Sequence, residues 1–117
     1  MAFKFEKLKV WEKAVDLSGK VSELIENFPK KEMYVLSSQM QRATDSIALN
    51  IAEGSTGQTN PEFKRFLGIA VRSAIEVVCC LHLGRKRKII TDKQFEVFYE
   101  ELTVLIKSIQ ALRNSIN

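Results

Sequence analysis

Hydrophobic residues recur along most of the chain at intervals of three and four positions, which is the period of one face of an α-helix. Four such stripes predict helices over residues 7–27, 31–53 and 61–87, and from 91 nearly to the end of the chain. No segment shows the alternation that a half-buried strand requires. The stripes consist of Val10, Ala14, Leu17, Val21, Leu24 and Phe28; Leu36, Met40, Ala43, Ile47 and Ile51; Phe63, Phe66, Leu67, Ala70, Ala74, Val77, Val78 and Leu81; and Phe95, Phe98, Leu102, Leu105, Ile109, Leu112 and Ile116.

The breaks between the stripes contain residues that end and begin helices. Both prolines of the chain fall at expected helix boundaries. Gly54 is expected to end the second helix in the left-handed conformation, and Asn60 to cap the third. Thr91 and Gln94 have the spacing of a capping box at the start of the fourth helix. Four helices joined by short loops predict an all-α, antiparallel up-down-up-down four-helix bundle.

The composition is that of an ordinary soluble protein, and 117 residues suit a single domain, 1–117. No uninterrupted apolar run reaches the roughly 20 residues that span a bilayer, and the charged N-terminus does not resemble a signal peptide. We therefore expect a cytoplasmic location and no membrane partner. The two cysteines, Cys79 and Cys80, are expected to be buried or half-buried reduced thiols.

The sequence offers little for catalysis. The single histidine, His82, lacks the serine or cysteine partners of a nucleophilic site, and no glycine-rich phosphate loop follows a strand. The Glu-x-x-His spacing of di-iron bundles is absent, because Cys79 stands where the glutamate is needed. Two thiols and one histidine do not make a zinc site. We expect no enzymatic activity, no metal and no cofactor.

A row of polar residues runs beside the hydrophobic stripe of the second helix, where charges need partners. In antiparallel pairing with the third helix, Arg42 is expected level with Arg72 and close enough to pair with Glu76. Gly68 is expected to pack against the second helix near Ser46. We interpret the row as a network that fixes helix register, with a ligand site between the helices as the alternative. The network residues are Arg42, Ser46, Asn50, Glu53, Arg72 and Glu76.

The clearest functional signal is a basic run in a chain whose formal net charge is +4. In the predicted topology, the first and third connections lie at the same end of the bundle. The resulting cationic pole consists of Lys30, Lys31, Arg85, Lys86, Arg87 and Lys88, with Glu32 and Asp92 as partial offsets. Such a cluster suits phosphate backbones, and without interleaved aromatic residues its binding should tolerate any sequence. The alternative is a solvated helix end whose cations complement the helix dipole.

The fourth helix is hydrophobic over most of its circumference, and the stripe of the first helix is also wide. The extra residues are Trp11 and Val15, and Val97, Tyr99, Val104, Ile106 and Ala111. Left uncovered, they would form a larger apolar patch than soluble monomers usually expose. We therefore expect a homo-oligomer.

Several stretches together resemble a known family. They are Leu8-Lys9-Val10-Trp11 with Ala14, Phe28-Pro29 with Glu32, Gln39-Met40-Gln41-Arg42-Ala43 with Ser46-Ile47, Asn50-Ile51-Ala52-Glu53-Gly54, and Glu62-Phe63 with Phe66-Leu67, Ile69-Ala70, Ser73 and Glu76. The pattern is similar to bacterial four-helix-bundle proteins encoded in intervening sequences of large-subunit ribosomal RNA genes. Accessory proteins of diversity-generating retroelements resemble the same family.

The resemblance implies a homopentameric ring of four-helix bundles with no known enzymatic activity. In the retroelement branch it also implies a basic surface that binds nucleic acid and a reverse transcriptase. Arg72 departs from the family, which often has glycine there, and the basic run after Leu83-Gly84 replaces an aromatic ending. We expect a non-enzymatic oligomer that binds RNA or DNA through the cationic pole. The alternative is a structural oligomer or protein-interaction adaptor, such as a reverse-transcriptase accessory protein, without direct nucleic-acid binding.

Overall fold

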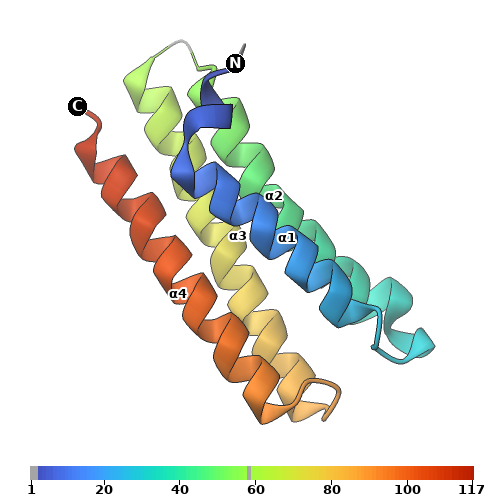
Figure 1. Ribbon diagram of the computed structural model, residues 1–117. Coiled ribbons are helices and arrows are strands. Elements are labelled where there is room, and N and C mark those ends of the chain that lie inside the picture. The colour runs from blue at the N-terminus through green and yellow to red at the C-terminus, as the bar shows by residue number, and fades with distance from the viewer. Residues whose placement is uncertain (1–2, 58) are drawn as a thin grey trace.

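Four long helices run side by side in the computed structural model, which describes residues 3–57 and 59–117 (Figure 1). They are α1 (Lys9–Ile25), α2 (Ser38–Ser55), α3 (Asn60–Lys86) and α4 (Asp92–Ser115). Three short helical turns precede α1 and α2: η1 (Lys4–Lys7), η2 (Lys30–Glu32) and η3 (Met33–Ser37). Each long helix runs opposite to the one before it, and both termini lie at the same end. The predicted all-α four-helix bundle is therefore confirmed.

The predicted stripes form most of the core between the helices. The whole α1 stripe and the whole stripe of residues 36–51 are buried. The α3 and α4 stripes are buried except at five positions that are only half-buried: Phe66, Val78, Phe98, Leu112 and Ile116. In addition, α3 buries Val71, Cys80 and Gly84, which lie outside its predicted stripe. Its buried arc is wide because α3 packs against both α2 and α4.

By length and composition alone, α3 could also cross a membrane, and 44% of its most apolar window is buried inside the bundle. The core helix of a soluble protein passes the same test. Because α3 packs against both α2 and α4, core packing accounts for part of its apolar composition.

The segment that leads into α2 departs from the regular helix predicted over 31–53. Residues Lys30–Glu32 form a 3₁₀ turn, Met33–Ser37 form a π-helical turn, and regular α-helix begins only at Ser38. The carboxylate of Glu32 is buried in this turn and accepts a hydrogen bond from the backbone N–H of Leu36 at 3.4 Å. The start of α2 is therefore shaped by a buried carboxylate. The spacing of hydrophobic residues does not indicate such a departure from regular helix.

The predicted role of Gly54 is wrong. The helix α2 continues through Gly54 to Ser55, and no glycine in the described residues has a positive φ. A Cβ atom at position 54 would lie 2.6 Å from the Cβ of Phe66 on α3. Glycine is needed here because α2 and α3 approach closely, not because the backbone turns.

Caps at the starts of α3 and α4 follow the expected chemistry with one change of residue. Thr59, not Asn60, caps α3, since its hydroxyl accepts from the backbone N–H of Glu62 at 3.2 Å. Asn60 is the first helical residue. At α4 the predicted capping box is confirmed: Thr91 accepts from the N–H of Gln94 at 3.1 Å, and the Gln94 side chain accepts from the N–H of Thr91 at 2.9 Å.

Candidate nucleic-acid interface

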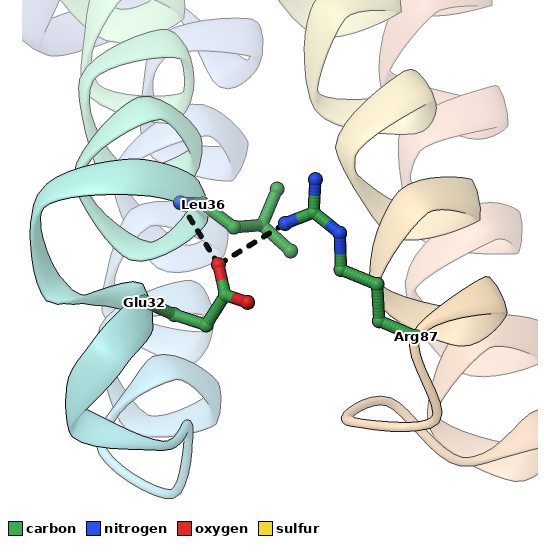
Figure 2. A network of polar contacts seen from close by, with 3 residues as sticks. All are labelled: Glu32, Leu36 and Arg87. Carbon is green, nitrogen blue, oxygen red and sulfur yellow. Dashed lines mark hydrogen bonds and ion pairs between the residues drawn. The ribbon is translucent and has the colours of Figure 1, made fainter.

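The cationic pole forms at the end of the bundle where the α1–α2 and α3–α4 connections both lie (Figure 1). An ion pair joins the two connections, because Nη1 of Arg87 lies 3.0 Å from Oε1 of Glu32 (Figure 2). Lys30 and Lys31 immediately precede Glu32 in η2. The structure therefore brings them to the same end as the basic run, as the topology predicted, and Glu32 is the expected partial offset.

The six cations of the pole are not equivalent. Arg87 is held by Glu32, whose side chain is only 10% exposed. The guanidinium carbon of Arg85 lies 3.6 Å from the ring centroid of Phe95 on α4, which is a cation–π contact. Four lysines remain, and among the described residues they form no ion pair: Lys30, Lys31, Lys86 and Lys88. All four are exposed, so their ammonium groups are available to an anionic partner.

Only part of the predicted polar row is a network between α2 and α3. The hydroxyl oxygens of Ser46 and Ser73 lie 2.9 Å apart across the two helices. The side-chain amide of Asn50 donates to the hydroxyl of Ser46 at 2.9 Å. Glu53 is exposed and does not extend this chain of hydrogen bonds. The hydrogen bonds that join Ser46, Asn50 and Ser73 therefore involve no charged group.

The predicted ion pair between Arg42 and Glu76 is wrong. Among the described residues, Glu76 accepts a hydrogen bond from the side-chain amide of Gln39 at 3.2 Å, and neither ion pair present involves Arg42. Both charges are exposed, so water solvates them and a pair would add little. They border an open polar groove of ≈ 340 Å³ between α2 and α3, which is lined by Gln39, Arg42, Ala43, Ser46, Ser73 and Glu76.

Arg72 lies on the other side of α3, which sequence reasoning did not anticipate. It borders a groove of ≈ 350 Å³ between α3 and α4, whose lining residues are Arg65, Gly68, Ile69, Val71, Arg72, Gln110 and Arg113. Nε of Arg113 donates to the backbone carbonyl of Lys64 at 3.0 Å. We call Arg65, Arg72 and Arg113 the arginine groove.

The predicted contact of Gly68 with α2 near Ser46 is also wrong. A Cβ atom at Gly68 would lie 3.4 Å from Nη2 of Arg113, so Gly68 faces α4. An added Cβ would only touch the guanidinium group at ordinary contact distance, so no close approach of two backbones requires glycine at this position.

Three rings lie further along the same α3–α4 face, toward the cationic pole. The ring of His82 on α3 lies edge-on to Phe95 at 4.8 Å, and Phe95 stacks on Tyr99 at 5.4 Å with an interplanar angle of 25°. Phe95 is buried, whereas His82 and Tyr99 are exposed. We call these residues the aromatic cluster. The basic run itself contains no aromatic residue, as predicted, but folding brings His82 of α3 and Phe95 and Tyr99 of α4 close to it.

The two cysteines differ in their surroundings. Burial, with Glu76 nearby as a lesser cause, raises the pKa of the Cys80 thiol to about 11, so it stays protonated and unreactive near neutral pH. Cys79 is exposed, contrary to the prediction for both cysteines. Within residues 3–57 and 59–117, no group of three or more His, Cys, Asp or Glu side chains could hold a metal ion.

The fold and its basic surfaces define a small four-helix-bundle protein with cations gathered at one end and along one face. The family model described as 23S rRNA-intervening sequence protein matches residues 6–111, and the chain belongs to this family. The resemblance drawn from the sequence is thus confirmed for the ribosomal RNA intervening-sequence family, while the relation to retroelement accessory proteins stays a prediction.

A solved structure is similar over most of the chain. The crystal structure of a protein of unknown function from the S23 ribosomal protein family of Bacteroides thetaiotaomicron is similar, with a TM-score of 0.83 and 25% sequence identity. The match covers 90% of this chain and 95% of the Bacteroides chain. No curated protein shows significant similarity.

Proposed function

We propose that this protein is a non-enzymatic, oligomeric member of its family that binds RNA or DNA electrostatically through the cationic pole. The observation that carries the proposal is the gathering of four exposed lysines from two connections at one end of the bundle, none of which pairs with an acidic residue in the described part of the chain. Lysines at such a surface release condensed counterions when they contact phosphates, and this release supplies most of sequence-independent affinity.

The two arginines of the pole have a structural role instead. Arg87 ties η2 to the end of α3 through Glu32, and Arg85 rests on the ring of Phe95. Arg87 thus joins the two connections and Arg85 joins α3 to α4, while the lysines beside them contact phosphates as mobile point charges. Binding of this kind contacts backbones instead of base edges, so it should tolerate any sequence.

The test is the salt dependence of binding to a labelled RNA or DNA duplex, measured by fluorescence anisotropy. If about four phosphates are contacted, log K for the wild type should fall with log salt at a slope of about −3 to −4. Replacing the lysines of the pole (Lys30, Lys31, Lys86 and Lys88) with Gln should bring the slope close to zero without unfolding the bundle, because these positions are exposed.

The matched control removes the same charge at the other end of the bundle, with Gln at Lys4, Lys7, Lys9 and Lys13. It should keep most of the wild-type slope. Absence of wild-type binding to any RNA or DNA at about 50 mM salt, where such contacts are strong, would refute the proposal. If the control variant lost as much of the salt slope as the pole variant, binding would depend on net charge and not on the cationic pole.

We further propose that the chain forms a homo-oligomer, with the pentamer implied by the family resemblance as its expected size. Support comes from an apolar groove of ≈ 440 Å³ between α1 and α2, lined by Phe5, Trp11, Val15, Ser18, Asp45, Ala48, Leu49 and Ala52. Leu49, 61% exposed, and Val15, 41% exposed, both line this groove, and a contiguous exposed apolar patch is typical of an interaction site. A ring would repeat the cationic pole in each subunit and raise affinity through effective concentration.

The same apolar surfaces support a second candidate, a structural oligomer or protein-interaction adaptor that does not bind nucleic acid. A reverse transcriptase as its partner rests on the resemblance to retroelement accessory proteins alone. The salt titration separates the two candidates, because an adaptor should show no nucleic-acid binding at any salt concentration.

A further inference from the structure

We infer that the α3–α4 face binds single-stranded nucleic acid, with the arginine groove holding phosphates and the aromatic cluster stacking on bases. This inference rests on the proposed function, since it assumes a nucleic-acid ligand. It adds a second surface, distinct from the lysines of the cationic pole, and it names the form of the ligand.

The arginine groove has the charge that a phosphate chain requires. Three of its seven lining residues are arginines and none is acidic. The surrounding helices reinforce this charge, because α3 has no Asp or Glu between Glu62 and Glu76, and α4 has none after Glu101. Within the described residues, no arginine of the groove belongs to an ion pair. One planar guanidinium group can donate two parallel hydrogen bonds to two oxygens of the same phosphate, which suits arginine to this ligand.

Contacts within the protein hold two of the three guanidinium groups in place. Arg113 is fixed by its bond to the Lys64 carbonyl, and Arg65 lies 4.7 Å above the ring of Phe66. Arg72 is exposed at the edge of the groove. Because fewer rotamers must be frozen on binding, preorganised guanidinium groups lose less entropy than free ones.

The aromatic cluster offers a surface for an unpaired base. Phe95, only 5% exposed, supports Tyr99 from beneath, while Tyr99 itself is 45% exposed. His82 stands edge-on to Tyr99 at 6.4 Å. A base can stack on the outer side of Tyr99, and every base has a face that fits a ring. In a duplex these faces are covered by neighbouring base pairs, so the cluster favours a single strand.

The two parts are spaced for several nucleotides. From Arg65 to Arg85, α3 advances 20 residues, or about 30 Å at 1.5 Å per residue. Glu96 and Glu100 are exposed on α4 on either side of Tyr99 in the sequence. They repel phosphates, as does the exposed Glu76 one turn after Arg72. The backbone of the strand should therefore run from Arg72 toward Lys86 on the α3 side, nearer His82 than Glu76.

The experiment compares a labelled 12-nucleotide oligouridine with a 12-base-pair RNA duplex, both by fluorescence anisotropy. Tyr99→Leu should weaken binding of the single strand about five- to 150-fold, the range for loss of one stacked base. Duplex affinity should stay within about two-fold of the wild type. Tyr99→Phe keeps the ring and should restore single-strand affinity, which separates stacking from a role of the hydroxyl group.

Two further variants locate the site. Tyr34, the other tyrosine, is 88% exposed in η3 at the cationic pole. Tyr34→Leu should change neither the affinity for the single strand nor the affinity for the duplex. Arg72→Gln should lower the single-strand salt slope by about 0.7, the value for one phosphate contact. Circular dichroism checks that each variant keeps its helices.

The outcomes distinguish this inference from the proposed function. If Tyr99→Leu binds the single strand as tightly as the wild type, or if Tyr34→Leu loses affinity instead, the inference is wrong and the cationic pole keeps its role. The inference also fails if the wild type binds duplex with a steep salt slope but does not bind oligouridine. Absence of binding to both ligands would overturn the inference and the proposed function together.

Discussion

Gly54 and Gly19 both lie inside helices, but their surroundings differ. The space beside Gly54 is occupied by α3, since an added Cβ atom would lie 2.6 Å from the Cβ of Phe66 and 3.0 Å from Cδ1 of Phe63. The Cβ of Phe66 is attached to the α3 backbone and cannot swing away. Gly19, exposed on α1, has nothing within 4 Å of such an atom. The same residue type therefore has a packing role at one position and none at the other.

We predict opposite effects for Ala at these two positions. Gly54→Ala should lower the free energy of unfolding by about 1–3 kcal/mol, because overpacking forces α2 and α3 apart. Gly19→Ala should raise it by about 0.5–1 kcal/mol, because alanine favours helix and meets no neighbour. Urea unfolding followed by circular dichroism measures both. A stabilising Gly54→Ala would contradict the close approach of the two helices.

Between elements, the contact of Glu32 with Arg87 joins η2 to the C-terminal end of α3 (Figure 2). The carboxylate is nearly buried, so its loss of hydration must be offset by the guanidinium and by the N–H of Leu36. We therefore expect this pair to be worth more than a surface ion pair.

Arg87→Gln should lower the free energy of unfolding by about 1–3 kcal/mol, because it leaves a shielded carboxylate without its cation. Lys86→Gln, at an exposed neighbouring position, should change it by less than about 0.5 kcal/mol. The double variant Glu32→Gln with Arg87→Gln should recover part of the loss, since no charge is then left unpaired. Equal effects of Arg87→Gln and Lys86→Gln in urea unfolding would contradict a structural role for the pair.

The sequence predicts where a side chain lies around its own helix axis better than how each helix is rotated against its neighbours. Periodicity places each side chain around its own helix axis, which is why the stripes of α1 and α2 are buried as predicted. The rotation of α3 against its neighbours depends on packing of the whole core. For this reason Arg72 and Gly68 were predicted on the α2 side and lie on the α4 side.

The same limit explains which candidate sites could be predicted. The cationic pole follows from topology alone, because two connections of an up-down-up-down bundle must share an end. The arginine groove and the aromatic cluster combine residues of α3 with Arg113, Phe95 and Tyr99 of α4. Their meeting depends on helix rotation, so no local pattern in the sequence indicates it.

Across the whole molecule, which measures 43 × 23 × 21 Å, the surfaces are separated. The helices pack in the cyclic order α1, α2, α3, α4, so the apolar α1–α2 groove and the basic α3–α4 face lie on opposite sides. In a ring, the α1–α2 groove of one subunit covers a different surface of the next subunit. The α3–α4 face is open to nucleic acid if that second surface is another part of the bundle. This arrangement allows the two proposed activities to coexist in one small chain.

We predict that sedimentation at micromolar concentration gives a species heavier than the 13.4 kDa chain, and five times heavier if the pentamer forms. Leu49→Asp places a charge in the α1–α2 groove and should dissociate the oligomer into monomers. Val104 of α4 is 47% exposed and lies outside that groove. Val104→Asp should therefore leave the oligomer assembled. A wild-type monomer would refute the oligomer, and dissociation by Val104→Asp alone would place the interface on α4.

Dissociation should also separate avidity from the affinity of each site. A long RNA can contact several cationic poles of one oligomer, whereas a 12-nucleotide strand is too short to bridge distant subunits. Leu49→Asp should therefore weaken binding of the long RNA about 100-fold or more, the usual range for lost multivalency. Binding of the short strand should stay within about two-fold, because the α3–α4 face lies opposite the substituted groove. Equal losses for both ligands would mean that the α1–α2 groove itself contacts nucleic acid.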